Sequence, residues 1–458
     1  MDIESRVNKA AFKIGVDWDT EADVNEALAG ITPKNKGVPK LNYPALEVDE
    51  VTDANETDIE HANYAPTDFQ LDFDMCFDGR EMSILGMLFG EANTPQPLFV
   101  IDATNNKIDF NDAAPALKVA TVASGSYTGA TLATAIAAAM NAVVGVTGTF
   151  ACSFSTSTLK FTINETGGPT NFELLWNTGT NKAVDISTLC GFSDAADDSG
   201  AATYTGDIAA PGSGAYSHTL TMKDSTSGIF GTYAVEKGND KIHVVPSFKP
   251  MKMTMTVNNG MIRLSLNNRG TKVIDDSAIV TTMSSVTYPA IHNSTRAKFH
   301  QAVFWLNAQA GDALDSGDVI NPKNFNLEFD RKLDSEHGSG SSTIMEPLEN
   351  GKPTVKLGLE FARKDAVNDL FFAEWVAETE KKASITLTGP VIVGTFTYSM
   401  AVELPRLMFE DVEFADAGII PAKIVQRAVV ADSAPTGMTV TKPLTITLVN
   451  TRSTSLIA

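Results

Sequence analysis

Apolar and polar residues alternate along the start of Thr67–Gly90, which reads TDFQLDFDMCFDGREMSILGMLFG. Within Phe69–Phe77 every second residue is apolar, and the positions between them include Asp72 and Asp74. A period of two predicts a strand with one buried face and one polar face. An aspartate–glycine turn follows, and the apolar run Glu81–Phe89 predicts a short helix that a glycine ends.

Similar features recur in the last third of the chain. Phe325–Asp330 alternates in the same way, with Glu328 and Asp330 on its polar side. Val355–Phe361 predicts a further strand. Asp365–Thr379 predicts a helix with a broad apolar face, and its first residue is a suitable N-cap. We therefore expect two packed units of similar build, the first of them interrupted by a guest domain.

A change of composition marks the guest domain. Only six residues of 94–212 are Lys, Arg or Glu, and prolines flank the stretch at Pro95–Pro97 and Pro211. The clearest helical pattern of the chain is Gly129–Val144. An Asn-Asn pair predicts a hairpin between Phe99–Asp102 and Lys107–Phe110. We expect a compact α+β domain inserted through proline-containing joints.

The segment before the first unit predicts little regular structure. Thr20–Ala29 is a candidate short helix, and the acid-rich stretch Leu46–Glu60 predicts an arm that is either solvated or ordered on a neighbouring subunit. Elsewhere many short strands are predicted, such as Met251–Val257 and Met261–Leu266 around the turn Asn258-Asn259-Gly260.

The predicted fold class is mainly β with few helices, of α+β type. It consists of two tandem sandwich- or barrel-like domains, the first interrupted by the small α+β insert. The predicted boundaries are an N-terminal arm at 1–66, a first domain at 67–97 plus 213–310, the insert at 98–212 and a second domain at 311–458.

Composition narrows the function classes. The chain has 458 residues, 43% of them hydrophobic, and a formal net charge of −21. That charge argues against a protein that grips nucleic acid, because phosphate contacts need Lys and Arg. Three cysteines far apart predict free thiols made in a reducing compartment. The sequence shows neither a secretory signal nor an apolar run of membrane-spanning length.

No motif for chemistry is evident. The glycine-rich stretches lack the Lys-Ser/Thr ending of a phosphate-binding loop. There is no His-Glu-x-x-His, no cysteine pair at metal spacing and no serine elbow. We therefore predict no catalytic, metal or cofactor-binding residues, no cofactor and no enzymatic activity.

Three parts of the chain together resemble the major tail tube protein of long-tailed, siphovirus-like bacteriophages. They are Thr67–Gly90, the stretch AYSHTLTMKDSTSGIFGTYAVEKGNDKIHVV, and the pattern from Ile344-Met-Glu-Pro347 through the predicted helix to Glu403-Leu-Pro405. The insert, with IDATNNKIDF and SYTGATLATAIAAAMNA, separately resembles a small domain of phage virion proteins.

The resemblance implies a structural virion protein. Subunits would form rings that stack into the tail tube, the conduit for DNA ejection. Two domains per chain favour homotrimeric, pseudo-hexameric rings, with homohexamers as the alternative. Implied partners are further copies of the chain and the tape measure, tail tip and tail terminator proteins. DNA would pass without specific binding, and assembly would occur in the bacterial cytoplasm. The insert would decorate the tube exterior.

The resemblance also gives candidate roles to residues. Asp72, Asp74, Glu328 and Asp330 are candidate lumen-facing acids, which would repel DNA phosphates within a Debye length of about 8 Å. The flexible stretch 334–343 is a candidate ring-to-ring loop or a merely mobile hairpin tip; its named residues are Asp334, Ser335, Glu336, Gly338 and Gly340.

Two other functions remain open at this point. A phage fibre or adhesin with a carbohydrate-binding insert is the main alternative, and a cluster of exposed Trp or Tyr would favour it. The insert offers only Trp176, Tyr127 and Tyr204. A capsid or decoration protein is the third, and the lack of a long spine-like helix counts against a capsid shell subunit.

Overall fold

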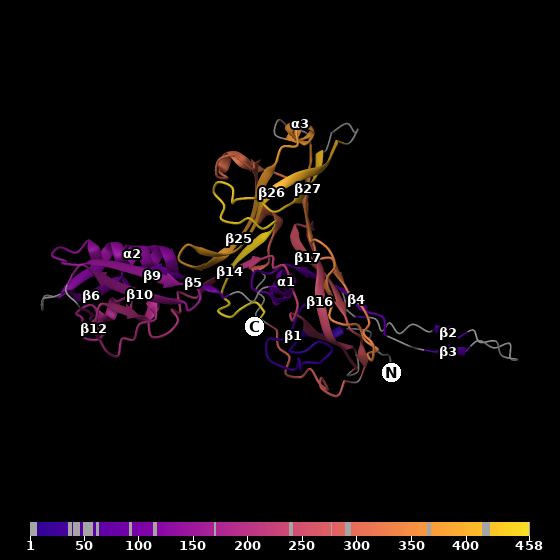
Figure 1. Cartoon of the computed structure of the whole chain (residues 1–458), viewed down its shortest axis with the longest axis horizontal. Coiled ribbons are helices and arrows are strands. Elements are labelled where there is room, and N and C mark those ends of the chain that lie inside the picture. The colour runs from indigo at the N-terminus through magenta and orange to yellow at the C-terminus, as the bar shows by residue number, and fades with distance from the viewer. Residues whose placement is uncertain are drawn as a thin grey trace.

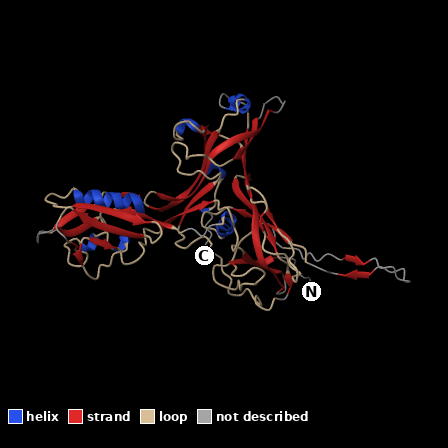
Figure 2. Cartoon of the chain, viewed as in Figure 1, coloured by secondary structure: helices blue, strands red, loops and turns tan. Residues whose placement is uncertain are grey.

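The structure is a computed structural model. It describes residues 7–34, 39, 46–48, 58–60, 64–90, 94–112, 117–168, 171–237, 241–275, 277–288, 295–363, 368–414 and 422–457. Strands dominate it (Figure 2), which confirms the mainly β class with few helices. The α-helices are α1 (Glu81–Phe89), α2 (Gly129–Asn141) and α3 (Phe371–Val376). The three cysteines are unpaired, as predicted.

One order of strands occurs twice along the chain. The first repeat consists of β1 (Val7–Ile14), β4 (Thr67–Asp74), α1, β15 (Gly231–Lys237), β16 (Lys241–Asn258), β17 (Met261–Gly270) and β18 (Ile274–Asp275). The second repeat has the same order: β19 (Ala302–Ala308), β24 (Thr354–Phe361), α3, β25 (Lys381–Val393), β26 (Phe396–Phe414), β27 (Ala422–Ala428) and β28 (Thr445–Asn450). It has two additional strands between β19 and β24, which are β20 (Val319–Ile320) and β21 (Asn324–Asp330).

The pairings of the first repeat recur in the second. β15 pairs with β1 and β16 as β25 pairs with β19 and β26. β17 pairs with β16 and β4 as β27 pairs with β26 and β24. β18 returns to the first half of β16 as β28 returns to that of β26. The two long strands β16 and β26 therefore each take part in two sheet regions.

A continuous seven-stranded antiparallel sheet, in the order β4-β17-β16-β21-β24-β27-β26, runs through both repeats. The link between the repeats is β21, which pairs with β16 on one side and β24 on the other. Alternate side chains of these strands, such as Phe73, Leu264, Met255 and Leu327, are buried in one hydrophobic core that spans the two repeats. Apolar residues at every second position thus give the sheet one buried face.

The insert has a core of its own, built from residues 99–210. Its strands are β5 (Gln96–Ile101), β6 (Lys107–Asp112), β7 (Lys118–Thr121), β8 (Gly125–Thr128), β9 (Thr149–Ser155), β10 (Lys160–Thr166), β11 (Phe172–Leu174), β12 (Asp198–Ala201) and β13 (Thr203–Thr205). It joins the body through β5 and β14 (Ala215–Thr221), which pair with each other. Figure 1 shows it projecting from one side of the body.

Two short hairpins complete the described elements. One pairs β2 (Leu46–Val48) with β3 (Asp58–Glu60), and the other pairs β22 (Leu333–Asp334) with β23 (Leu348–Glu349). Each immediately precedes one of the two equivalent strands β4 and β24. The β2–β3 hairpin projects from the body on the side opposite the insert (Figure 1).

Several local predictions are wrong. The predicted N-terminal arm, 1–66, contains β1, which is a strand of the body. Thr20–Ala29 is not helical, because backbone groups there bond elsewhere: Asn25 N donates to the Asp23 carboxylate, and Ala22 N donates to Thr232 Oγ1. The proposed hairpin of the insert does not form either. β5 pairs with β14 and β8, whereas β6 pairs with β11 and β7.

The predicted helix Asp365–Thr379 is also shorter than expected. Its proposed N-cap, Asp365, lies outside the described residues. A 3-10 turn at Asn368–Leu370 leads into α3, which ends at Val376. Most of its apolar face is not buried: Phe371 points into the core, whereas Phe372 and Val376 are exposed.

Buried Glu81 gives a prediction for pH dependence. Its Oε1 accepts the backbone N–H of Cys76 at 2.8 Å. Burial raises the pKa of Glu81 from its ordinary value of 4.5 to about 7. Between these values the unfolded chain loses a proton that the folded protein keeps, so stability falls as the pH rises through this window.

Glu81→Gln keeps the acceptor and removes the titration. We expect the two proteins to be similar near pH 5, and the variant to be more stable near pH 8 by at most about 3 kcal/mol. Urea unfolding at both pH values measures this. Parallel pH dependences for the two proteins would show that Glu81 is not the group involved.

Candidate functional site

The four candidate acids all lie on the solvent-facing side of the seven-stranded sheet, which we call the polar face. Asp72 and Glu328 belong to one row of directly paired residues, which share a face by the geometry of antiparallel pairing. That row reads Asp72, Ser265, Thr254, Glu328, Lys356, Arg427 and Met408. Asp74 is two residues along β4 from Asp72, and Asp330 is two along β21 from Glu328. The alternation in the sequence therefore placed all four correctly relative to the core.

The acids on the polar face have partners. Lys34 Nζ lies 2.6 Å from the Asp74 carboxylate, and Lys252 Nζ lies 2.8 Å from that of Glu328. Asp330 pairs with Lys332 at 2.5 Å. Asp72 accepts a hydrogen bond from Gln70 Nε2 at 2.6 Å.

Further along the same face the pairing of charges continues. Glu410 lies 2.6 Å from Lys356 and 3.9 Å from Arg427, and Glu413 lies 3.3 Å from Lys423. The polar face is therefore a surface of mixed, mutually neutralised charge. From the sequence we named only the acids of this face, because the bases that pair with Asp74 and Glu328, Lys34 and Lys252, are distant in the chain.

The candidate ring-to-ring loop is the tip of the β22–β23 hairpin, and it lies against the first repeat. Tyr64 N donates to Ser342 O at 2.8 Å, and His337 Nε2 lies 2.8 Å from Tyr64 O. Asp334 accepts from Asn350 Nδ2, and its pKa is lowered by that bond and by one from Ser335 N. Glu336 O accepts from Met345 N. Most of the residues from Glu336 to Ser342 are exposed, Gly340 among them, whereas Ser335 and Gly338 are half-buried.

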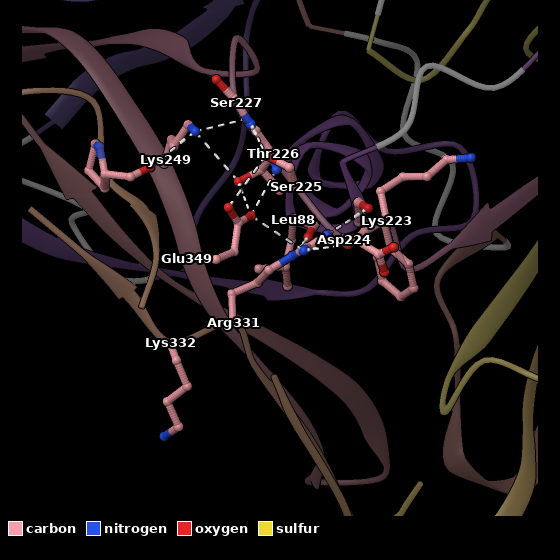
Figure 3. Close-up of polar contacts among 12 residues, drawn as sticks. Leu88, Lys223, Asp224, Ser225, Thr226, Ser227, Lys249, Arg331, Lys332 and Glu349 are labelled. Carbon is pink, nitrogen blue, oxygen red and sulfur yellow. Dashed lines mark hydrogen bonds and ion pairs between the residues drawn. The ribbon is translucent and has the colours of Figure 1, made fainter. Parts of the chain in front are cut away.

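A buried arginine anchors the base of this hairpin. The Arg331 side chain, 1% exposed, donates through Nε to Leu88 O at 2.7 Å and through Nη2 to Phe89 O at 2.8 Å. These are carbonyls of the last turn of α1, which lack helical partners. Nη1 donates to Lys223 O at 2.6 Å. Figure 3 shows this guanidinium between the hairpin, α1 and the segment 223–227.

Half-buried Glu349 and buried Lys249 hold the same region. Glu349 Oε1 accepts from Thr226 N at 2.7 Å and lies 3.5 Å from Arg331 Nη1 (Figure 3). Burial raises the pKa of the Glu349 carboxyl, but the Thr226 hydrogen bonds and Arg331 outweigh that effect and lower it, so the group is ionised. Lys249 Nζ lies 2.6 Å from Glu346 and donates to Thr226 O. Sequence reasoning did not find this cluster, because its members are far apart in the chain.

A short internal repeat in the sequence was also missed. Ile31-Thr-Pro-Lys-Asn35 matches Ile320-Asn-Pro-Lys-Asn324. In the structure, Ile31 N donates to Ala10 O of β1, and Ile320 pairs with Phe304 of the equivalent strand β19.

The lysines of this repeat are also equivalent in space. Lys34 N donates to Asp72 O of β4 at 2.6 Å, and Lys323 N donates to Glu360 O of β24 at 2.6 Å. The match, identical at four of five positions, is thus a signal of duplication that could have been read directly.

The two outer edges of the seven-stranded sheet carry no strand among the described residues. β4 pairs with β17, and on its other side Lys34 N donates to Asp72 O. The second half of β26, Met408–Glu413, pairs with β27 and has no described strand on its other side. Open edges present unpaired backbone groups to another chain.

The described part of the chain offers no evident reaction centre. Within it, no three His, Cys, Asp or Glu side chains are grouped in a way that would hold a metal ion. No described helix is both long and apolar enough to cross a membrane. No protein-family model and no curated protein matches the chain.

The buried cluster gives a stability prediction. Arg331→Ala removes the side-chain donor of Leu88 O and one of the two donors of Phe89 O, and it takes the cation away from Glu349, which keeps its hydrogen bonds from Thr226. We therefore expect a loss of about 3 kcal/mol. Arg427→Ala, which removes a guanidinium 47% exposed on the polar face, should cost no more than about 1 kcal/mol. Urea unfolding of both variants compares them. Equal losses would show that the Arg331 contacts contribute no more than a surface ion pair.

Proposed function

We propose that this chain is a structural subunit of a phage tail tube, which polymerises as stacked rings and conducts DNA into the host. The observation that carries the proposal is the seven-stranded sheet formed by two repeats of one strand order, with no described strand on either of its outer edges. A sheet of this kind becomes edge-free when copies of the chain join end to end into a closed ring.

The duplication supports homotrimeric rings with pseudo-sixfold symmetry. Each chain brings two repeats, so three chains give six similar positions; homohexameric rings are the alternative. Contact between the β26 end of one chain and the β4 end of the next is heterologous, which is the type that closes into rings. The tape measure, tail tip and tail terminator proteins are the further partners of such a tube.

The polar face is the proposed lining of the bore. Its lysines and arginines are neutralised by nearby carboxylates, such as Lys252 by Glu328 and Lys356 by Glu410. They are therefore poorly placed to bind phosphate, and DNA would find no row of free cations. On this proposal DNA passes easily because the cations of the lining are already paired, and not because unpaired acids repel it.

The insert and the β22–β23 hairpin have separate proposed places. The insert, with its own core and its position at one side of the body, would decorate the tube exterior. The hairpin tip from Asp334 to Gly340, on its buried anchor, would contact the next ring. The adhesin alternative loses support, since Trp176 and Tyr204 are buried in the insert core and offer no stacking platform for a sugar.

Negative-stain electron microscopy with native mass spectrometry of the purified protein tests the proposal. We expect rings or hollow tubes, with masses that are multiples of three chains. Masses in multiples of six alone would favour the hexamer. A protein that is monomeric at high concentration, and whose insert binds glycans on an array, would support the adhesin instead.

A charge reversal tests the lining. Glu328→Lys removes the partner of Lys252 and adds a cation on the polar face, so assembled protein should retain duplex DNA at about 50 mM salt and release it near 200 mM. Asp432→Lys makes the same charge change at a carboxylate that is 99% exposed and outside the sheet. Filter binding compares the two. Equal DNA retention by both variants would contradict a lining role for this face.

A further inference from the structure

The second repeat lacks a cover that the first repeat has. All nine residues of α1 are buried. In the equivalent region of the second repeat, α3 and the residue before it, Leu370 is 58% exposed, Phe372 51% and Val376 69%. We call these three residues the α3 patch. A cluster of exposed apolar side chains on one short helix indicates a surface that is covered in the working state.

The cover of α1 is supplied by the second repeat of the same chain. Phe329, at the end of β21, packs edge-on against Phe89 with ring centroids 5.3 Å apart. Arg331, two residues after Phe329, donates to backbone carbonyls in the last turn of α1. Ile457, which follows β28, lies against Gly86, and Arg452 donates to Ser83 Oγ at 2.7 Å.

The same contrast holds for the long strands. The second half of β16 is covered on its outer edge by β21. The second half of β26, the equivalent strand, has that edge open in the described structure. Helix α1 packs on β16 as α3 packs on β26. The open edge of β26 and the α3 patch therefore lie in one region. In the described structure neither has the neighbour that β21 and the residues after it provide for β16 and α1.

We propose that the α3 patch and the open edge of β26 form one docking surface for the first repeat of a second copy of this chain. The second copy takes the position that the second repeat takes against the first within one chain. Its contacting side is the β4 edge, where Lys34 N bonds Asp72 O as Lys323 N bonds Glu360 O. The partner's identity follows from the duplication, and the inference rests on the proposed function in taking that partner to be another subunit.

The α3 patch can be tested without disturbing the core, because its side chains point outward. Phe372→Glu places a charge in the proposed contact and should raise the protein concentration needed for half assembly by about tenfold or more. Phe372→Leu keeps an apolar contact and should assemble like the wild type. Val144→Glu, at an insert residue 95% exposed, is the matched control and should also assemble normally.

An experiment that mixes the Phe372→Glu variant with wild-type chains tests whether the contact is heterologous. Because the contact is heterologous, Phe372→Glu still presents an intact first repeat, and an excess of it should block ring closure by wild-type chains. Sedimentation velocity measures assembly, and circular dichroism melting verifies that the variant is folded. Wild-type rings together with unimpaired assembly of Phe372→Glu would overturn this inference and leave the tube proposal standing. A wild-type chain that stays monomeric at all concentrations would overturn both.

Discussion

The arrangement of this molecule depends on the pairing of β21 with β16. This ladder joins the sheet of the second repeat to that of the first, and it brings Phe329 and Arg331 onto α1. Burying an arginine away from water lowers the stability of the fold unless its N–H groups find acceptors in the protein. Here they end on helix carbonyls, on Lys223 O and on Glu349, so the contact between the repeats is fixed in one register.

The same pairing makes the proposed assembly intelligible. β26 is the equivalent of β16, and among the described residues the second half of β26 has no strand in the place that β21 takes beside β16. The exposed α3 patch lies on this strand. The insert and the β2–β3 hairpin project from opposite sides of the body (Figure 1). Neither is part of the seven-stranded sheet, so both can vary in size without altering its closure.

The sequence predicted those elements whose pattern is local. Period-two alternation located β4 and β21, and the Asn258-Asn259-Gly260 turn located the hairpin of β16 and β17. Helix α2 matched the spacing of its apolar stripe. The acids of the polar face were assigned to the correct side of the sheet because a strand's two faces follow from the alternation alone.

Features that depend on distant partners were not predictable in this way. β16 is a single strand of 18 residues that contains Pro246 and Pro250, whereas we predicted Met251–Val257 as a separate, shorter strand. β1 was missed because its residues, VNKAAFKI, alternate poorly. The bases that neutralise Asp74 and Glu328 come from distant parts of the chain. The net charge of the polar face could therefore not be judged from its acids alone.

Joining two repeats in one chain has a consequence for how a ring is made and how it can change. In the proposed ring every second contact between repeats is intramolecular, so it forms at a high effective concentration and without the loss of translational freedom that each free subunit would suffer. The joined copies can also diverge. One has accepted a guest domain between α1 and β15 while the other keeps a short connection, so decoration would alternate around the circumference, a pattern that identical single-repeat subunits cannot produce.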